Sequence, residues 1–430
     1  MSYPLQFFGY QDGILSADGV SLNTIATQIG TPVYIYSERA LLTPLRQLKK
    51  SLAELDATIC FAMKSNSNLS ILKTLCQEGA GLDIVSGGEL YRASLVGVAA
   101  EKVVFSGVGK TQEEMQSALF YNDGRGIRSF NIESIQELKS LNELARSKGK
   151  RPRVALRFNP DVNPKTHPYI STGLRENKFG LNRTEIIQIA QNIGNFESLT
   201  FSGISIHIGS QLTDLAPIED AFQKTVELIE ELDSILPAPL QWVDLGGGIG
   251  ITYKDEHAPS IKDYCDLIKR HFSVRKSGHP PLQIMIEPGR MISGNSGVLI
   301  TQVLYRKTRE DKDFLVLDAA MNDLMRPALY GSHHEIVPVT ELQPNSLHKK
   351  TNIVGPVCES SDCFANDCDF PEYIEHGDLL AILSAGAYGM SMSSTYNSRP
   401  RAAEVLIQKT GYKVIRKRET YLDLVQQELV

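Results

Sequence analysis

The sequence predicts an α/β protein that combines a (β/α)8 barrel with a second, β-rich domain of the β-sandwich or barrel-like kind. Eight strand-like apolar runs alternate with helix-like segments between about residues 58 and 290, and this alternation is typical of parallel βαβ units. After Arg290, strand-like runs continue without long helices between them. The chain has 430 residues, too many for one ordinary domain, so two domains are expected.

The first domain is expected to be a closed barrel because eight βα units occur in one domain-sized stretch. A doubly wound open sheet is the alternative, since a strand count from one sequence changes easily by one or two. The expected strands are Thr58–Met63, Gly81–Val85, Lys102–Phe105, Ile127–Phe130, Arg153–Phe158, Gly203–His207, Gln241–Leu245 and Leu282–Glu287. The expected helices are Ser67–Glu78, Gly87–Leu95, Gln112–Tyr121, Ile132–Ser147, Arg183–Ile193, Pro217–Leu236 and Pro259–Arg275.

The second domain is expected to be β-rich because its apolar runs are short and lack helical stretches between them. Val33–Tyr36, which precedes the barrel, is also strand-like and could join this domain. We therefore expect residues 1–35 to join the β-rich domain, 36–290 to form the barrel and 291–430 to form the C-terminal β-rich domain. Its expected strands are Gly297–Tyr305, Phe314–Leu317, Thr351–Val354, Leu379–Leu383 and Ala403–Gln408, followed by a helix at Glu419–Leu429.

Composition and charge exclude several classes of function. A net charge of −6 argues against a surface for nucleic acid or anionic membrane. No apolar stretch approaches the ~20 residues that span a bilayer, and Met1–Gly13 lacks the pattern of a signal peptide. Six scattered cysteines suit a reducing cytoplasm better than a disulfide framework. Three of them form a C-x4-C-x4-C run, which is not a usual zinc spacing, so no metal is expected. The cysteines are Cys60, Cys76, Cys265, Cys358, Cys363 and Cys368.

Three segments supply the parts that a pyridoxal phosphate site needs. Lys64 follows the first strand-like run, Gly246-Gly247-Gly248 follow the seventh, and Glu287 ends the eighth. A lysine amine forms an imine with an aldehyde, glycine amides hold a phosphate, and a carboxylate keeps a pyridine nitrogen protonated. Reactive groups of such barrels lie where strands end, so these segments are expected at one mouth. The predicted cofactor is pyridoxal 5′-phosphate.

Each of these segments also has an ordinary interpretation. A lysine at the end of an apolar strand usually extends to solvent. A triple glycine is often a tight turn, and its spacing here does not fit a dinucleotide-binding motif. Glu287 could pair with the nearby Arg290 at a turn. The order of all three segments along a barrel favours the cofactor interpretation.

Four further residues are candidates because of their positions. His207 ends the sixth run, so its ring could stack on the pyridine while Ser210 reaches the phosphate, although most lone histidines are ordinary core or surface residues. Asp83 lies near the end of the second run and could cap a helix or act near the imine. Cys358 is inert by default, but beside a cofactor carbanion it could donate a proton, since thiols titrate at ~8.5.

Over nearly its whole length the chain resembles the diaminopimelate decarboxylases, which are fold-type III pyridoxal phosphate enzymes. Ornithine and arginine decarboxylases and, more distantly, alanine racemase share that fold type. The cofactor motifs identify only the superfamily, whereas the last three segments named below separate this branch from the others. One local departure, the polar Phe201-Ser-Gly-Ile-Ser-Ile-His, involves no assigned role. The matching segments are Phe61-Ala-Met-Lys-Ser-Asn, Gly81-Leu-Asp-Ile-Val-Ser-Gly-Gly-Glu-Leu, Asn177-Lys-Phe-Gly-Leu, His207-Ile-Gly-Ser-Gln, Asp244-Leu-Gly-Gly-Gly, Glu287-Pro-Gly-Arg, Cys358-Glu-Ser-Ser-Asp, Met321-Asn-Asp-Leu-Met-Arg-Pro-Ala-Leu-Tyr, Gly386-Ala-Tyr-Gly and Ser394-Thr-Tyr-Asn-Ser-Arg-Pro-Arg.

The resemblance implies a role for each candidate. Lys64 carries the cofactor covalently, and Cys358 donates a proton. Cys358 and Glu359 reach the site from the partner subunit, which implies a homodimer with shared active sites. The residues implied to bind the cofactor are Lys64, Asp83, His207, Ser210, Gly247, Glu287, Pro288, Gly289, Arg290 and Tyr388. Those implied to bind the substrate are Arg290, Arg326, Tyr330, Glu359 and Tyr388.

The activity that the resemblance implies is decarboxylation of meso-2,6-diaminopimelate to L-lysine and carbon dioxide, the last step of lysine biosynthesis. The distal end of this substrate carries a carboxylate and an ammonium, which Arg290, Arg326 and Glu359 could pair. Ornithine has only an ammonium there, so two arginines would repel it. The alternatives are an ornithine, arginine or carboxynorspermidine-type decarboxylase, an amino-acid racemase, and a non-catalytic carrier or regulator.

Overall fold

The chain divides into two compact units in a computed structural model that describes residues 6–163, 176–275, 278–310, 312–342, 345–409 and 411–429. The barrel unit comprises Pro44–Ile251 and His257–Met291. The β-rich unit comprises Met1–Thr43, Thr252–Glu256 and Ile292–Val430. The short segment Thr252–Glu256 therefore belongs to the β-rich unit although it lies within the barrel sequence.

The barrel unit contains a closed barrel of eight strands in the order β10-β11-β12-β5-β6-β7-β8-β9. Every neighbouring pair is parallel. This arrangement confirms the predicted (β/α)8 barrel and excludes the open doubly wound sheet. The strands are β5 (Ala57–Ala62), β6 (Gly81–Ile84), β7 (Val103–Phe105), β8 (Ser129–Ile132), β9 (Arg153–Phe158), β10 (Thr200–Ile206), β11 (Trp242–Asp244) and β12 (Gln283–Ile286).

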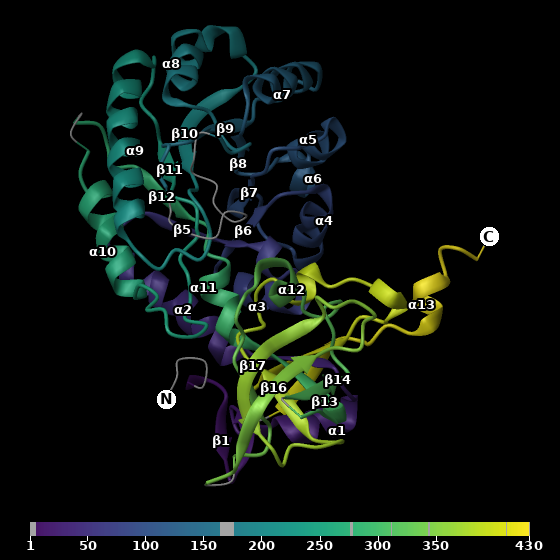
Figure 1. Ribbon diagram of the computed structural model, residues 1–430. Helices are drawn as coiled ribbons and strands as arrows, with labels where there is room; N and C mark the ends of the chain where they lie inside the picture. Colours follow the sequence, from purple (N-terminus) through teal and green to yellow (C-terminus); the bar gives the residue numbers. More distant parts are fainter. Residues whose placement is uncertain are drawn as a thin grey trace. The chain divides into compact units, whose positions relative to one another are not determined.

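The helices of the barrel unit lie outside its strands (Figure 1). Several begin at a serine whose side chain accepts a hydrogen bond from a backbone amide of the first helical turn, as Ser86, Ser134 and Ser260 do. That amide has no acceptor within the helix, so the serine satisfies it. The helices after the barrel strands are α3 (Leu69–Gln77), α4 (Gly87–Val96), α5 (Gln112–Leu119), α6 (Tyr121–Gly124), α7 (Ile135–Ser147), α8 (Arg183–Gln191), α9 (Ala216–Ile235), α10 (Ile261–Phe272) and α11 (Arg290–Ser293). Helix α2 (Glu38–Ser51) precedes them.

The barrel interior is filled by side chains, and this explains the polar sequence of β10. The indole Nε1 of Trp242 donates to Oγ of Ser202 at 3.1 Å. A Cβ at Gly203 would lie 2.5 Å from the indole ring. Ser202 thus satisfies a buried N–H and Gly203 makes room for the ring. With its centre filled, the barrel can hold a site only where its strands end.

The β-rich unit contains a nine-stranded mixed sheet. Its path is β17-β16-β14-β13-β4-β19-β20, and β18 connects β13 to β15. Strand β4 (Val33–Ser37) pairs antiparallel with β13 and parallel with β19. The other strands are β13 (Gly297–Thr308), β14 (Asp313–Leu317), β15 (Ile336–Pro338), β16 (His348–Val354), β17 (Cys363–Pro371), β18 (Leu379–Ile382), β19 (Ala403–Gln408) and β20 (Gly411–Arg416).

Some elements of the β-rich unit are not apparent in the sequence pattern. The polar strands β17 and β20 end the path of the sheet, where backbone pairing to one neighbour requires no apolar run. The last helix, α13, covers Tyr421–Val425 rather than the whole of Glu419–Leu429. A further small sheet and helix were also not expected, and consist of β1 (Gly9–Gln11), β2 (Ile14–Ala17), β3 (Val20–Ser21) and α1 (Leu22–Ile29).

Two global properties bear on function. Among the described residues, no helix is long and apolar enough to cross a membrane. The same part of the chain contains no group of three or more His, Cys, Asp or Glu side chains that could hold a metal ion. Within the C-x4-C-x4-C run, Cys358 is exposed, whereas the thiols of Cys363 and Cys368 contact backbone carbonyl groups of β16.

Candidate active site

Lys64 lies just beyond the carboxyl end of β5, in the 3-10 turn Met63–Ser65. Its Nζ is 3.1 Å from Oδ2 of Asp83. Asp83 is fully buried near the end of the neighbouring strand β6, in register with Ala62. The Lys64 side chain is 36% exposed. A buried carboxylate therefore orients an amine that a ligand can reach.

The glycine loop after β11 fits closely between the ends of β10 and β12. A Cβ at Gly247 would lie 2.1 Å from the carbonyl oxygen of Glu287, and a Cβ at Gly248 would lie 2.1 Å from that of Gly209. Gly246 and Gly248 also have φ angles of +63° and +103°, which favour glycine. Without side chains, the backbone amides of such a loop can approach an anion closely.

Arg290 and Ser210 add donors next to the same strand ends. Nη2 of Arg290 donates to Oγ of Ser210 at 3.0 Å. Ser210 follows β10, and Arg290 follows β12 at the start of α11. The glycine loop between them follows β11, so three adjacent barrel strands contribute. Hydroxyl, guanidinium and backbone amide groups are suitable partners for a phosphate.

The ring of His207 is held by the glycine loop. The amide of Gly247 donates to Nδ1 of His207 at 3.2 Å, so the neutral ring carries its proton on Nε2. Burial, followed by the positive charges of Lys64 and Arg157, lowers the pKa of His207 well below its ordinary value. His207 is therefore a neutral, flat group near the lysine.

Glu287 follows β12 and belongs to a buried polar cluster. Oγ of Ser106 donates to Oε1 of Glu287 at 3.2 Å. Nδ2 of Asn131 lies 3.4 Å from the same oxygen and 3.0 Å from Oδ2 of Asp244. Ser106 and Asn131 come from the ends of β7 and β8. Sequence reasoning missed both residues, because a single serine or asparagine at a strand end forms no recognisable motif.

The carboxyl groups of this cluster hold their protons tightly. Burial, followed by the charges of Asp244 and Asp83, raises the pKa of Glu287 well above its ordinary value. Burial also raises the pKa of Asp244, although hydrogen bonds oppose it. A positively charged hydrogen-bond donor beside these buried carboxyl groups would favour their ionised form.

These residues fit pyridoxal phosphate. A protonated pyridine nitrogen is the kind of cationic donor that the cluster around Glu287 favours. Oδ1 of the buried Asp83 has no hydrogen-bond partner among the described residues, which leaves an acceptor for a group near Lys64. The glycine loop offers its backbone to a phosphate, and Lys64 supplies the amine.

Arg326 and Tyr330 lie in the β-rich unit, at the first and last positions of α12 (Arg326–Tyr330). Residues four apart share one side of a helix. Arg326 is 5% exposed. Its Nη1 lies 2.7 Å from Nε2 of His334, and its Nη2 lies 3.3 Å from Oγ of Ser332. The guanidinium thus has a defined orientation within this unit.

Tyr388 has an unusual backbone conformation. Its φ angle is +55°, and holding a non-glycine residue there costs on the order of 1–3 kcal/mol. Two residues earlier, a Cβ at Gly386 would lie 2.0 Å from the carbonyl oxygen of Ser293. The Gly386-Ala-Tyr-Gly segment is therefore tightly constrained, and such strain occurs often at functional sites.

Cys358 and Glu359 are both exposed, and a neighbouring segment orients them. The amide of Cys358 donates to Oδ1 of Asn397 at 3.0 Å. Hydrogen bonds from Ser361 and then Tyr396 lower the pKa of Glu359, so its carboxylate is an anion at neutral pH. Tyr396 and Asn397 belong to the Ser394-to-Arg401 motif, but sequence reasoning gave neither of them a role.

Glu89 is another residue that sequence reasoning missed. Its Oε2 accepts a hydrogen bond from the amide of Val85 at 2.8 Å. Burial, together with the charge of Asp83, raises the pKa of Glu89 to about 7. A carboxyl group that titrates near neutrality therefore lies within electrostatic reach of Lys64 and Asp83.

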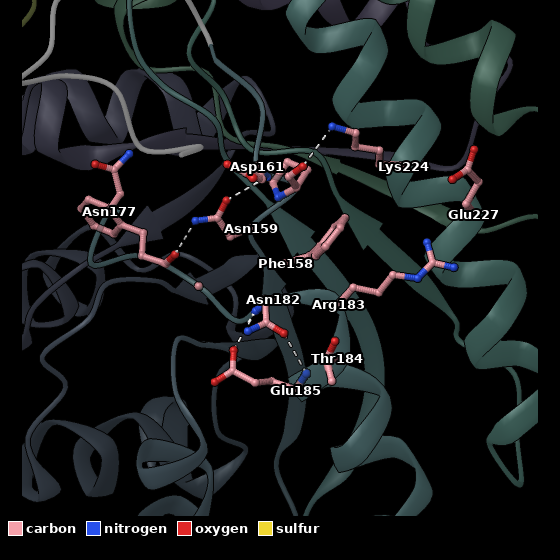
Figure 2. Close-up of a pocket in the computed structure, with 13 residues that line it drawn as sticks. Phe158, Asn159, Asp161, Asn177, Asn182, Arg183, Thr184, Glu185, Lys224 and Glu227 are labelled. Atoms are coloured by element: carbon pink, nitrogen blue, oxygen red, sulfur yellow. Dashed lines mark hydrogen bonds between the residues drawn. The ribbon is translucent and has the colours of Figure 1, made fainter. Parts of the chain in front are cut away.

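A separate cavity of about 690 Å³ lies at the carboxyl end of β9 and the start of α8. Figure 2 shows Asn159, Asn182 and Lys224 around it. Nδ2 of Asn159 donates to the carbonyl oxygen of Phe179 at 3.1 Å. None of the predicted site residues lines this cavity. Residues 164–175, which separate its two loops along the chain, lie outside the described residues, and the cavity carries no functional assignment.

The fold and the barrel-mouth residues define a class of protein, the barrel enzymes that use pyridoxal phosphate. Residues 39–294 match the family described as pyridoxal-dependent decarboxylase, pyridoxal binding domain. The chain is 44% identical to the diaminopimelate decarboxylase of Aquifex aeolicus (strain VF5), over 98% of this chain and 97% of that protein. It is 45% identical to the Vibrio cholerae enzyme of the same name, over 96% and 97%. The chain belongs to the diaminopimelate decarboxylase family.

Solved structures agree with this assignment. Diaminopimelate decarboxylase from M. jannaschii in co-complex with L-lysine has a TM-score of 0.92 and 38% identity, covering 99% of this chain and 98% of that one. The enzyme from Helicobacter pylori complexed with L-lysine has a TM-score of 0.88 and 41% identity, covering 94% and 98%. A lysine/ornithine decarboxylase from Vibrio vulnificus, 21% identical with a TM-score of 0.76 over 90% of this chain and 97% of that one, shares the fold.

Proposed function

We propose that this chain catalyses the pyridoxal phosphate-dependent decarboxylation of meso-2,6-diaminopimelate to L-lysine and carbon dioxide, the last step of lysine biosynthesis. The observation that carries the proposal is its identity of 44–45% to diaminopimelate decarboxylases over nearly the whole chain. The Lys64–Asp83 pair, the glycine loop and the Glu287 cluster at the barrel mouth support it.

Four residues of the barrel unit are proposed to hold and tune the cofactor ring. Pyridoxal phosphate supplies, when bound, a protonated ring that accepts the electrons released when the carboxylate leaves. Lys64 would bind it through Nζ, in the orientation that Asp83 fixes. Glu287 would accept a hydrogen bond from the ring nitrogen, and the neutral His207 would pack against the ring face.

The phosphate is proposed to lie where the ends of β10, β11 and β12 meet. Ser210 would donate through its hydroxyl, and Gly247 through its backbone amide. Pro288-Gly289-Arg290 follows β12 and would complete the cradle with the amides of Gly289 and Arg290. Charge-assisted hydrogen bonds of this kind are stronger than neutral ones.

The distal end of the substrate is proposed to pair with groups of both charges. Arg290, Arg326 and Tyr330 would bind its carboxylate, and Glu359 would bind its ammonium. Tyr388 would contact both the cofactor and the substrate. This arrangement would exclude ornithine and arginine, whose far ends carry only positive charge.

The active form is proposed to be a cytoplasmic homodimer in which the sites are shared. Cys358 and Glu359 are exposed on the chain, which suits residues that complete a partner's site. The Sγ of Cys358, directly or through a water, would return a proton to the carbon that loses carbon dioxide. The cytoplasmic location is supported by six cysteines that are all free.

The shared site predicts complementation between two inactive variants. A purified heterodimer with one Lys64→Ala subunit and one Glu359→Ala subunit should contain one intact site and show about half of the wild-type activity. Each variant homodimer should be nearly inactive. Differently tagged subunits, isolated through both tags, allow this measurement. A heterodimer as inactive as both homodimers would contradict shared sites.

Substrate choice tests the proposed reaction. The cofactor-loaded protein should release carbon dioxide from meso-diaminopimelate, with L-lysine as product, and not from L-ornithine or L-arginine. The measurement is the release of carbon dioxide from each of these amino acids separately. Release from ornithine or arginine alone would overturn the roles of Arg290, Arg326 and Glu359. No release from any of them, with the cofactor bound, would favour a racemase or a regulator.

A further inference from the structure

The guanidinium of Arg326 is enclosed by contacts on its edge and on its face. Nη1 lies 2.7 Å from Nε2 of His334, and Nη2 lies 3.3 Å from Oγ of Ser332. The central carbon of the guanidinium lies 4.7 Å from the ring centroid of Tyr253. The rings of Tyr253 and His334 meet edge to face, with centroids 5.2 Å apart. All four residues belong to the β-rich unit.

The chemistry of these groups determines the protonation state of His334. An arginine only donates hydrogen bonds, so Nε2 of His334 must accept from Nη1. On the other side of the ring, Nδ1 lies 2.8 Å from the carbonyl oxygen of Leu383, which only accepts. Nδ1 therefore carries the proton, and His334 is neutral. With 2% exposure, the ring has little room to turn.

Two different contacts then restrict the Arg326 guanidinium. The hydrogen bond to His334 directs one edge, because Nη1 must point at a fixed lone pair. The face contact with Tyr253 restricts rotation of the plane, since cations prefer the centre of an aromatic face. Tyr253 comes from Thr252–Glu256, far from Arg326 and His334 in the sequence. A guanidinium oriented in this way can present its fork to a planar carboxylate.

We propose that His334 and Tyr253 are positioning residues that orient Arg326 toward the distal carboxylate of the substrate and so contribute to substrate specificity. This inference rests on the proposed function, because Arg326 has that role only if the ligand carries a distal carboxylate. It assigns to His334 and Tyr253 a role that acts through their contacts with Arg326.

The proposed role of His334 and Tyr253 predicts different changes in the inhibition by two ligands that differ by one carboxylate. L-Lysine, the proposed product, keeps the distal amino-acid group of meso-diaminopimelate, whereas cadaverine lacks that carboxylate. In the His334→Leu variant, Nη1 of Arg326 loses its acceptor, and the guanidinium loses its defined direction. Inhibition by L-lysine should weaken about tenfold or more, because a hydrogen bond to a charged group is lost. Inhibition by cadaverine should change by less than about twofold.

Two further variants distinguish positioning from general damage. His334→Gln can still offer an oxygen to Nη1 and should keep most of the affinity for L-lysine. Tyr253→Leu keeps the histidine but removes the aromatic face, so it should weaken L-lysine and not cadaverine. His376→Leu is a matched control, because His376 also bonds a backbone carbonyl oxygen through Nδ1 but is exposed. It should leave both inhibition constants unchanged.

The experiment measures inhibition constants for L-lysine and cadaverine during carbon dioxide release from meso-diaminopimelate, with the cofactor-loaded enzyme. Equal weakening of both inhibitors in His334→Leu and Tyr253→Leu, or unchanged inhibition by L-lysine in both, would overturn the inference. If His334→Leu does not fold, His334→Gln and Tyr253→Leu remain as the test. Equal weakening of both inhibitors in Tyr253→Leu, or unchanged inhibition by L-lysine in that variant, would then overturn the inference. A wild-type enzyme that does not decarboxylate meso-diaminopimelate would instead contradict the proposed function.

Discussion

Replacement of Lys64 by alanine is expected to reduce turnover at least about 1,000-fold, because the chain loses the amine that binds the cofactor and moves protons near it. Covalent attachment should disappear as well. Borohydride reduction of the loaded wild-type protein should add the mass of the reduced cofactor to the peptide that contains Lys64. The same treatment of the alanine variant should add nothing.

The arginine substitution at the same position separates charge from nucleophilicity. Lys64→Arg keeps a cation beside Asp83, which lies 3.1 Å from the lysine amine, but a guanidinium does not form a stable imine. It should be as inactive as the alanine variant. Lys73→Ala, which removes an exposed lysine on α3, should keep full activity. Turnover near the wild-type rate by Lys64→Ala or Lys64→Arg would contradict the assigned role.

Replacement of Glu287 by glutamine is expected to reduce kcat about 100- to 1,000-fold and to change KM little. The amide keeps the shape of the side chain but holds a ring nitrogen in the protonated state far less well. That loss matters most when electrons flow into the ring, so it affects the chemical step more than substrate binding. Steady-state kinetics with meso-diaminopimelate measure both constants.

In the protein without cofactor, the same substitution should make the stability depend less on pH. Burial and the charges of Asp244 and Asp83 raise the pKa of Glu287, so the folded protein binds this proton more tightly than the unfolded chain. The resulting stabilisation is fully present below the unfolded pKa of about 4.3 and is lost as the pH rises through the folded pKa. Glu287→Gln has no proton to lose, so its free energy of unfolding should fall less than that of the wild type as the pH rises above the unfolded pKa of about 4.3.

Thermal unfolding of both cofactor-free proteins across this pH range measures the difference. Asp244→Asn is a matched comparison, because Asp244 shares Asn131 with Glu287 but is not proposed to contact the ring. It should reduce the pH dependence of stability and have a smaller effect on kcat. Equal pH dependence in the wild type and Glu287→Gln would contradict the raised pKa. An unchanged kcat in Glu287→Gln would exclude a contact with the ring nitrogen.

The barrel could be predicted from sequence because its signal is local and repeated. Apolar runs of strand length alternate with amphipathic helices, and parallel strands buried on both sides are mostly apolar. The predicted and observed ranges of Arg153–Phe158 coincide, and the other barrel strands agree within a few residues. The polar edge strands β17 and β20 were missed because pairing at the end of a sheet depends on the neighbouring backbone more than on side-chain pattern.

The sequence by itself determined the family, the eight barrel strands and the residue types of the candidate site, since these depend on short motifs and local periodicity. Only the tertiary structure decided which side chains meet. It brought Ser106, Asn131 and Asp244 to Glu287 from separate strands, and it brought Tyr253 and His334 to Arg326. These contacts join residues far apart in the chain and depend on burial and hydrogen-bond geometry, which no local pattern of residues encodes.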